Sequence, residues 1–352
     1  MRVAWILYGG LDQRTGGTLY DAIVVDGLRR AGDEVDVISL PVVAGRVRLS
    51  RDPAPARALA KAIRARRPDV VVGDELCFRE LAIAFPLVDA PCVLLVHHLT
   101  AWEVERSVHE RRSARVLERA AIRASDRVIA TSEATRRRLE REACGVAVEV
   151  AIPGSDRLPI EQRTTTEDAT PQVVFVGTIS ARKRVRELVR AFTRAHPEAR
   201  LTLVGSTTRE PAYARLVRQE IARLGLEARV VSTGEADDRG LARALANADV
   251  LVLASSLEGY GIAAAEAVRA GVPVIAARSP ALTEALAPCP LASTYVDDDD
   301  LAEALRRVTT DDALRASLRA AAREAAPRMP TWSACVDTFR LATAGVLREP
   351  KR

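Results

Sequence analysis

Residues 249–276 read DVLVLASSLEGYGIAAAEAVRAGVPVIA, and this stretch decides the fold. An apolar run, Asp249–Leu253, leads into a loop with two glycines. A helical pattern rich in alanine starts near Ile262, and a second apolar run follows at Val272–Ala276. Strand, helix and strand in this order predict a βαβ unit with parallel strands. The near-continuous Val, Leu and Ile runs are typical of strands buried on both faces.

The same alternation continues on both sides of this stretch. We expect strands at Val3–Leu7, Val35–Ile38, Val70–Val72, Cys92–Val96, Arg127–Thr131, Val146–Ile152, Val173–Val176, Arg200–Val204, Arg229–Ser232 and Ser293–Val296. We expect helices at Gly17–Arg30, Pro53–Arg67, Phe78–Leu87, Ser107–Ala124, Glu133–Glu142, Val185–Ala195, Glu210–Leu224, Asp238–Ala246, Asp299–Val308 and Thr331–Val346. The sequence therefore predicts two α/β halves of similar size.

The alternation stops between Pro153 and Thr170, where Pro, Thr and charged residues dominate, and we expect the linker there. The predicted domains are residues 1–160 together with the C-terminal residues 331–352, and residues 161–330. The acidic run Asp297–Asp300 precedes a helical pattern, so we expect it to cap that helix rather than to bind metal.

Composition excludes several classes of protein. The 352 residues are 48% hydrophobic and 28% charged, which is typical of about two soluble globular domains. Aromatic residues make up 4% and the net charge is only +5, so we expect no nucleic-acid partner. No apolar run reaches the ~18 residues of a membrane helix. With no export signal and five scattered cysteines, we expect a cytoplasmic protein with reduced thiols and at most peripheral membrane contact.

Glycine and polar residues follow the strands at their carboxyl ends, where α/β sheets bind ligands. They are Gly16 and Gly17 after the first strand, His97 and His98 after the fourth, Gly177 and Thr178 after the seventh, Gly234 after the ninth, and Glu258, Gly259, Tyr260 and Gly261 after the tenth. Repeated glycine at these positions indicates backbone that approaches a ligand.

Two segments predict a diphosphate site. Gly261 and Ile262 begin a helix whose free N–H groups would bind an anion, with Glu258 and Glu266 on either side to accept hydrogen bonds from hydroxyls. Arg182 and Lys183 follow a buried strand and supply cations for phosphate. Only three of the 52 basic residues are lysines, which makes Lys183 the more informative of the two.

These motifs, in their order and spacing, resemble the retaining family-four glycosyltransferases of the GT-B fold over nearly the whole chain. The resemblance rests on the glycine pair Gly16-Gly17, on SDRVIATSE (Ser125–Glu133), on VAIPGSD (Val150–Asp156), on the phrase Val176–Lys183, and on Glu258 and Glu266, which match an E-x7-E signature. It implies two Rossmann-like domains that face each other across a cleft, with the C-terminal helix crossing back to the first domain. The chain departs from the family pattern at Thr178, at the asparagine missing from VAIPGSD, and between Arg278 and Asp297, where a glycine-bearing segment is missing.

The resemblance also implies roles for these residues. Glu266 would hold the ribose hydroxyls and Glu258 the transferred sugar, while Arg182 and Lys183 would stabilise the diphosphate, helped by N–H groups near Gly261 and Ile262. His97 would reach the sugar from the other domain, and Gly234 would flank the base. The donor would be a nucleoside-diphosphate sugar, UDP- or GDP-linked, with no other cofactor.

We expect transfer with retention at the anomeric carbon and without a metal, since arginine, lysine and a helix N-terminus meet the leaving-group charge. The four histidines, His97, His98, His109 and His196, show no metal-ligand spacing. Three alternatives stay open: an inverting transferase with Asp74, Glu75 or His97 as base, a sugar-nucleotide epimerase, and a catalytically silent binding subunit. A nicotinamide dehydrogenase is set aside, because the first turn lacks G-x-G-x-x-G.

The acceptor stays undefined between a saccharide, a lipid-linked sugar and a small metabolite. We expect it on the first domain, near Gly16-Gly17, Asp74-Glu75 and residues 100–123. That last stretch mixes basic residues with four glutamates, which indicates a solvated helix rather than a membrane-surface helix.

Overall fold

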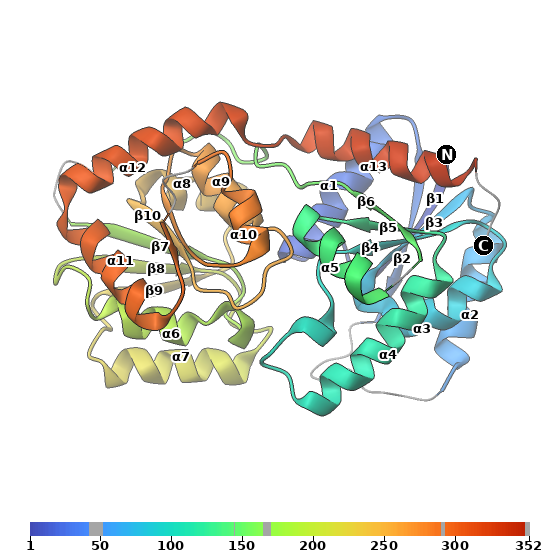
Figure 1. Ribbon diagram of the computed structural model, residues 1–352, viewed down its shortest axis with the longest axis horizontal. Coiled ribbons are helices and arrows are strands. Elements are labelled where there is room, and N and C mark those ends of the chain that lie inside the picture. The colour runs from blue at the N-terminus through green and yellow to red at the C-terminus, as the bar shows by residue number, and fades with distance from the viewer. Residues whose placement is uncertain (42–51, 144, 165–169, 290–292, 349–352) are drawn as a thin grey trace. The chain divides into compact units, whose positions relative to one another are not determined.

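A computed structural model describes residues 1–41, 52–143, 145–164, 170–289 and 293–348. The chain divides into two compact units, Met1–Pro153 with Trp332–Arg352, and Gly154–Thr331. Each unit has one parallel six-stranded sheet with helices packed along it (Figure 1). The α/β class predicted from the sequence is confirmed.

The sheet of the first unit has the order β2-β1-β3-β4-β5-β6. Its strands are β1 (Arg2–Tyr8), β2 (Glu34–Leu40), β3 (Val70–Asp74), β4 (Cys92–Val96), β5 (Arg127–Ala130) and β6 (Ala147–Val150). Its helices are α1 (Gly16–Arg30), α2 (Ala54–Arg66), α3 (Phe78–Ala84), α4 (Val108–Ala124), α5 (Glu133–Ala143) and α13 (Trp332–Val346). The strand order reverses between β1 and β3, which places a topological switch point there.

The sheet of the second unit has the order β12-β11-β10-β7-β8-β9, so its switch point lies between β7 and β10. Its strands are β7 (Gln172–Val176), β8 (Arg200–Val204), β9 (Val230–Gly234), β10 (Val250–Leu253), β11 (Val274–Ala277) and β12 (Ser293–Tyr295). Its helices are α6 (Val185–Phe192), α7 (Pro211–Arg223), α8 (Asp238–Asn247), α9 (Ile262–Arg269), α10 (Pro280–Ala285), α11 (Asp298–Thr310) and α12 (Asp312–Ala325).

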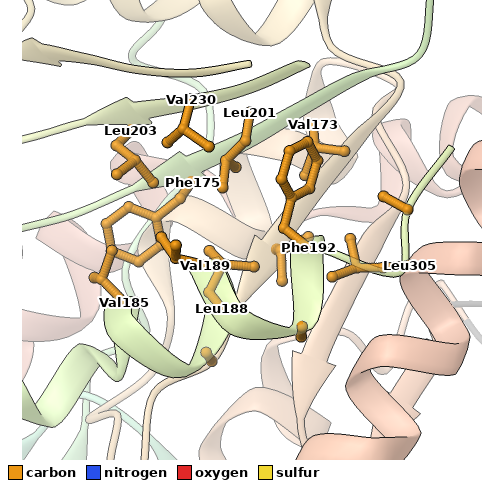
Figure 2. Close-up of a cluster of buried hydrophobic side chains, with 14 of the residues drawn as sticks. Val173, Phe175, Val185, Leu188, Val189, Phe192, Leu201, Leu203, Val230 and Leu305 are labelled. Carbon is orange, nitrogen blue, oxygen red and sulfur yellow. The ribbon is translucent and has the colours of Figure 1, made fainter. Parts of the chain in front are cut away.

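Helix α6 illustrates how the spacing of apolar residues directs one face of a helix into the core. Its apolar residues Val185, Leu188, Val189 and Phe192 recur at helical spacing and lie on one face. Figure 2 shows this face packed against side chains of β7, β8 and β9, among them Phe175. The side chains of this cluster are almost completely buried, and the site described below lies at the carboxyl ends of strands that contribute to it.

All twelve predicted strands are present, and their bounds differ from the expected ones by at most two residues. Helices α10 and α12 were not predicted, since α10 is short and begins at a proline, and α12 is rich in Ala and Arg with few large apolar residues. The expectation for the acidic run is confirmed: Asp297 is the N-cap of α11, and its Oδ1 accepts the N–H of Asp300 at 2.9 Å.

The expected linker is largely built into the second unit. The break between units lies at Pro153–Gly154, and Arg163 Nη1 contacts Asp249 Oδ1 at 2.8 Å. Residues 165–169 of the expected linker, and Cys144, lie outside the described residues. The other four cysteines are free and buried. Among the helices that the structure describes, none is long and apolar enough to cross a bilayer.

The expectation of a solvated helix over residues 100–123 is wrong at one position. Helix α4 turns Glu118 inward, where only 1% of the residue is exposed. Its carboxylate accepts the N–H of Ala101 at 3.3 Å. Glu118 lies in the same buried stripe of α4 as Ala114, Ala121 and Ile122, and the apolar pattern did not reveal its burial because a carboxylate occupies this position of the stripe.

Candidate functional site

Three charged residues of the second unit, Arg182, Lys183 and Glu258, lie close together at the switch point between β7 and β10. Lys183 follows β7, and Glu258 lies in the loop after β10. Lys183 Nζ lies 2.5 Å from Glu258 Oε1, and Arg182 Nη1 lies 3.7 Å from Glu258 Oε2. The lysine and glutamate side chains are only 15% and 8% exposed. Residues 75 positions apart thus form one ion cluster.

The Glu258 carboxylate of this cluster is held in its charged state. Burial raises the pKa of Glu258, but Lys183 and Arg182 outweigh it and lower that pKa to about 2. Burial also lowers the pKa of Lys183, and Glu258 opposes this effect. Arg182 donates a further hydrogen bond from Nη1 to the Leu257 carbonyl at 2.6 Å, which ties the cation loop to the β10 loop.

Glycine shapes the start of helix α9. Gly261 has φ +111°, a conformation that side chains rarely adopt, and a Cβ there would lie 2.6 Å from Leu282 Cδ2. No side chain caps this helix. The N–H groups of Ile262 and Ala263 thus have no side-chain cap and can bind an anion, whereas those of Ala264 and Ala265 donate to the Gly261 carbonyl.

Glu266 lies one turn into α9 and is 2% exposed. Its carboxylate faces a cation: Arg157 Nε lies 2.6 Å from Glu266 Oε1, and Arg157 Nη1 lies 2.7 Å from Asp238 Oδ1. Burial raises the pKa of Glu266 to about 7, although Arg157 lowers it in part. The carboxyl therefore gains or loses its proton near neutral pH.

Arg157 also belongs to this candidate site, although no sequence motif pointed to it. It directly follows the VAIPGSD phrase, but the chain is so rich in arginine that one more carried no signal. Its side chain is 12% exposed, and it bridges Glu266 on α9 and Asp238 on α8. The segment expected to be a linker therefore contributes a cation to this edge of the sheet.

The other predicted residues of this unit lie at or after the carboxyl ends of its strands. Gly177 and Thr178 follow β7, and Gly234 ends β9 with φ +74°. Gly259 and Tyr260 lie in the β10 loop, where Tyr260 is buried. The contacts of these five residues with a donor stay predictions.

The first unit holds a second group of polar residues at its own switch point. His97 follows β4, and its Nε2 lies 3.5 Å from Asp21 Oδ1 and 3.8 Å from Asp74 Oδ2. Asp74 ends β3, and Asp21 lies on α1, five residues after Gly16. Gly17 makes room for the imidazole, since a Cβ there would lie 3.2 Å from His97 Cδ2.

His97 and His98 have different partners, as expected of neighbours at a strand end. His98 Nε2 contacts Glu103 Oε1 at 2.9 Å, outside the group around His97. Burial raises the pKa of Asp21 to about 7. Burial and the neighbouring Asp21 raise the pKa of Asp74 to about 8.

The expectation that the chain binds no metal stays a prediction. Ligand atoms of Asp21, Asp74 and His97 all lie within 4.8 Å of one another. No spacing rule could have found them, because they come from three separate βα units of one sheet and meet only at the switch point.

Comparison with known proteins places the chain in a family. Residues 20–156 match the family described as Glycosyltransferase Family 4, and residues 156–325 match Glycosyl transferases group 1. A D-inositol 3-phosphate glycosyltransferase from Stackebrandtia nassauensis is 34% identical over 203 residues, which cover 55% of this chain and 45% of that protein. The chain thus spans about half the length of such curated relatives.

Two solved structures share the fold over the full chain. Sucrose-phosphate synthase from Thermosynechococcus elongatus has a TM-score of 0.82 at 20% identity and covers 99% of both chains. HepE from Anabaena, in complex with UDP and glucose, has a TM-score of 0.77 at 20% identity over 98% of this chain and 100% of that chain. With both family matches lying end to end on the two α/β units, this chain belongs to the family-four, group 1 glycosyltransferases.

Proposed function

We propose that this chain moves a sugar from a nucleoside-diphosphate sugar to an acceptor hydroxyl, with retention of the anomeric configuration and no metal ion at the diphosphate. The observation that carries the proposal is the buried Lys183–Glu258–Arg182 cluster at the switch point of the second unit. Two cations held charged beside a free helix N-terminus suit a leaving group with two phosphates.

Lys183 and Arg182 would act on the leaving diphosphate. As the bond between the anomeric carbon and the phosphate oxygen breaks, negative charge grows on that oxygen, and the two cations and the N–H groups of Ile262 and Ala263 stabilise it. Glu258 keeps both cations in place before the donor binds. Its second role is to accept hydrogen bonds from the transferred sugar.

Glu266 would hold the ribose. A carboxylate with two oxygens can accept hydrogen bonds from both ribose hydroxyls, and its position on α9 is one turn from the proposed phosphate site. Arg157 keeps part of this carboxyl population ionised. The ribose would therefore share Glu266 with Arg157 or displace Arg157 from it.

Retention follows from a transfer on one face of the sugar. The acceptor oxygen forms its bond to the anomeric carbon on the side that the diphosphate leaves, and the acceptor proton goes to the departing phosphate oxygen. No protein carboxylate forms a covalent bond in this scheme. The inverting alternative would instead use Asp74, Glu75 or His97 as a base.

UDP is the first donor nucleotide to test. HepE, which shares the fold, was solved with UDP and glucose. GDP remains the second choice. The acceptor, whether a saccharide, a lipid-linked sugar or a small metabolite, would bind to the first unit.

The test starts with thermal shifts of the full chain against UDP-, GDP- and dTDP-sugars. For the nucleotide that binds, Lys183→Ala and Glu266→Ala should each weaken donor turnover by at least roughly 100-fold, the usual scale for loss of a charge-stabilising group. Lys61→Ala, which removes an exposed lysine of α2, is the matched control and should change nothing.

Three outcomes contradict the proposal. Turnover that survives in Lys183→Ala and Glu266→Ala removes the site assignment. A product with inverted configuration by NMR removes the retaining mechanism. Donor binding without transfer or hydrolysis, across all acceptor classes, favours the silent binding subunit.

A further inference from the structure

We propose that Arg157 is a positioning residue of the donor site, which holds the Glu266 carboxylate charged and oriented for the ribose and stays in place when the ribose binds. Arg157 acts here on the carboxylate to which the proposed function assigns the ribose, so the proposal rests on that function. Three features carry it: the contacts of the guanidinium, the acceptor positions that they leave on Glu266, and the burial of both side chains.

The Arg157 guanidinium joins three segments of the second unit. Arg157 lies just after the break between the units, Asp238 begins α8, and Glu266 lies on α9. Arg157 Nη1 donates to Asp238 Oδ1 at 2.7 Å, and Nη2 donates to Glu266 Oε2 at 3.2 Å. Nε lies 2.6 Å from Glu266 Oε1. All three nitrogens are therefore used, and the planar guanidinium holds the orientation of the carboxylate.

These contacts leave Glu266 able to accept further hydrogen bonds. An ionised carboxylate has about four lone-pair positions. Oε1 is buried and, among the residues that the structure describes, accepts no hydrogen bond, although Arg157 Nε faces it as an ion-pair partner. Buried oxygens usually have a hydrogen-bond donor, and a ribose hydroxyl would supply it. Oε2 keeps one lone pair for the second hydroxyl. The ribose can thus bind Glu266 without displacing Arg157.

Burial makes the charge of Glu266 depend on Arg157. The two side chains are only 2% and 12% exposed. Burial raises the pKa of Glu266 to about 7, Arg157 opposes this rise, and the negative charge of Asp238 adds to it. Within the described residues, Arg157 and Asp238 are the charged groups recorded as acting on this carboxyl. Without Arg157 the pKa of Glu266 would rise further, and a neutral carboxyl is a weaker acceptor for hydroxyls.

A second arginine of the same stretch has a different location. Arg163 Nη1 lies 2.8 Å from Asp249 Oδ1, and Asp249 directly precedes β10, at the amino end of that strand. Asp238 and Glu266 instead lie in helices that follow β9 and β10, at the carboxyl ends of the strands. Arg163 therefore ties the stretch to the unit away from the donor site, and it provides a matched control.

The experiment titrates the full chain with UDP, or with GDP where UDP does not bind, by isothermal calorimetry. Relative to wild type at the same pH, Arg157→Ala should bind roughly 10-fold or more weakly at about pH 7, and the loss should shrink towards about pH 9, where Glu266 regains its charge. Arg157→Lys keeps a cation and should recover part of the loss at about pH 7. Arg163→Ala should bind as the wild type does at both pH values.

Two further variants separate this role from folding and from direct contact with the nucleotide. Where Arg157→Ala does not fold, as judged by the Tm without nucleotide, Arg157→Gln removes the charge and keeps more of the side chain. Glu266→Gln should itself weaken binding, and adding Arg157→Ala to it should weaken binding little further, because the arginine then has no carboxylate to hold.

Three results would overturn the role of Arg157 alone, with nucleotide binding by the wild type intact. They are equal affinity in the wild type and Arg157→Ala, a loss of the same size at both pH values, and an undiminished loss from Arg157→Ala in the Glu266→Gln background. The last would mean that Arg157 contacts the nucleotide itself. A wild-type chain that binds neither UDP nor GDP would overturn the proposed function, and the role of Arg157 with it.

Discussion

Glu118 shows at the scale of one residue how burial changes the chemistry of a carboxylate. It is 1% exposed, and burial raises its pKa to about 7, although the Ala101 N–H lowers it in part. The folded chain therefore holds this proton more tightly than the unfolded chain does. Stability from this group is present below about pH 4.5 and is lost as the pH rises towards 7.

Replacing Glu118 by Gln should remove this pH dependence. The amide oxygen can still accept the Ala101 N–H. We therefore expect the free energy of unfolding of Glu118→Gln, relative to that of the wild type, to rise by up to about 3 kcal/mol from pH 4 to pH 8. Denaturant unfolding at both pH values, followed by tryptophan fluorescence, measures this change in the free energy of unfolding. Glu34→Gln, an exposed glutamate in the same unit, is the control. A gain that is the same at both pH values would show that Glu118 is not the titrating group.

Lys183 and Glu258 depend on each other. Lys183→Met leaves Glu258 buried with only the more distant Arg182, so we expect the second unit to lose about 3–5 kcal/mol of stability. Glu258→Gln added to Lys183→Met should recover most of that loss, since no charge then lacks its partner. The free energies of unfolding of the wild type, the two single variants and the double variant, measured by denaturant unfolding followed by circular dichroism, complete this double-mutant cycle. Additive losses would mean that the two side chains do not interact.

At the scale of the element, helix α9 depends on one glycine. In Gly261→Ala, the new Cβ would meet Leu282 Cδ2 at 2.6 Å at a backbone conformation with φ +111°. We expect a loss of about 1–3 kcal/mol in the second unit and weaker nucleotide binding, because the first N–H groups of α9 move. Isothermal titration with the donor nucleotide and circular dichroism measure the two effects.

Gly345→Ala is the contrasting variant for α13. A Cβ there would meet Arg127 Nη1 at 3.6 Å, an ordinary contact, inside a helix with no positive φ. We expect it to stabilise the first unit by about 0.5–1 kcal/mol. If both glycine variants lose the same stability, the close approach at Gly261 is not the cause.

At the scale of the whole molecule, helix α13 belongs to the first unit although it comes last in the chain. Phe339 is fully buried, and the centroid of its ring lies 5.3 Å from that of Trp5 and 6.4 Å from that of Tyr20. Arg340 Nε also contacts Asp33 Oδ2 at 2.7 Å. The last helix is therefore part of the core of the first unit.

Phe339→Ala should separate the two units in an unfolding experiment. We expect the first unit to lose about 3–5 kcal/mol while nucleotide binding by the second unit persists. All three tryptophans, Trp5, Trp102 and Trp332, belong to the first unit, so their fluorescence reports on it alone. Leu341→Ala, 74% exposed on the same helix, is the control. A parallel loss of nucleotide binding would show that the two units unfold as one.

The sequence by itself determined the order of strands and helices and the βα loops that carry Lys183, Glu258 and Glu266. Apolar periodicity and glycine act over a few residues, so they can be read without knowing what packs on what. Only the tertiary structure decided that Arg157 pairs with Glu266, that Glu118 is buried, and that Asp21, Asp74 and His97 converge. The contact of Arg157 with Glu266 and the group of Asp21, Asp74 and His97 join segments that are far apart in the sequence, and the strand order of each sheet, which brings such segments together, is not written in any local pattern.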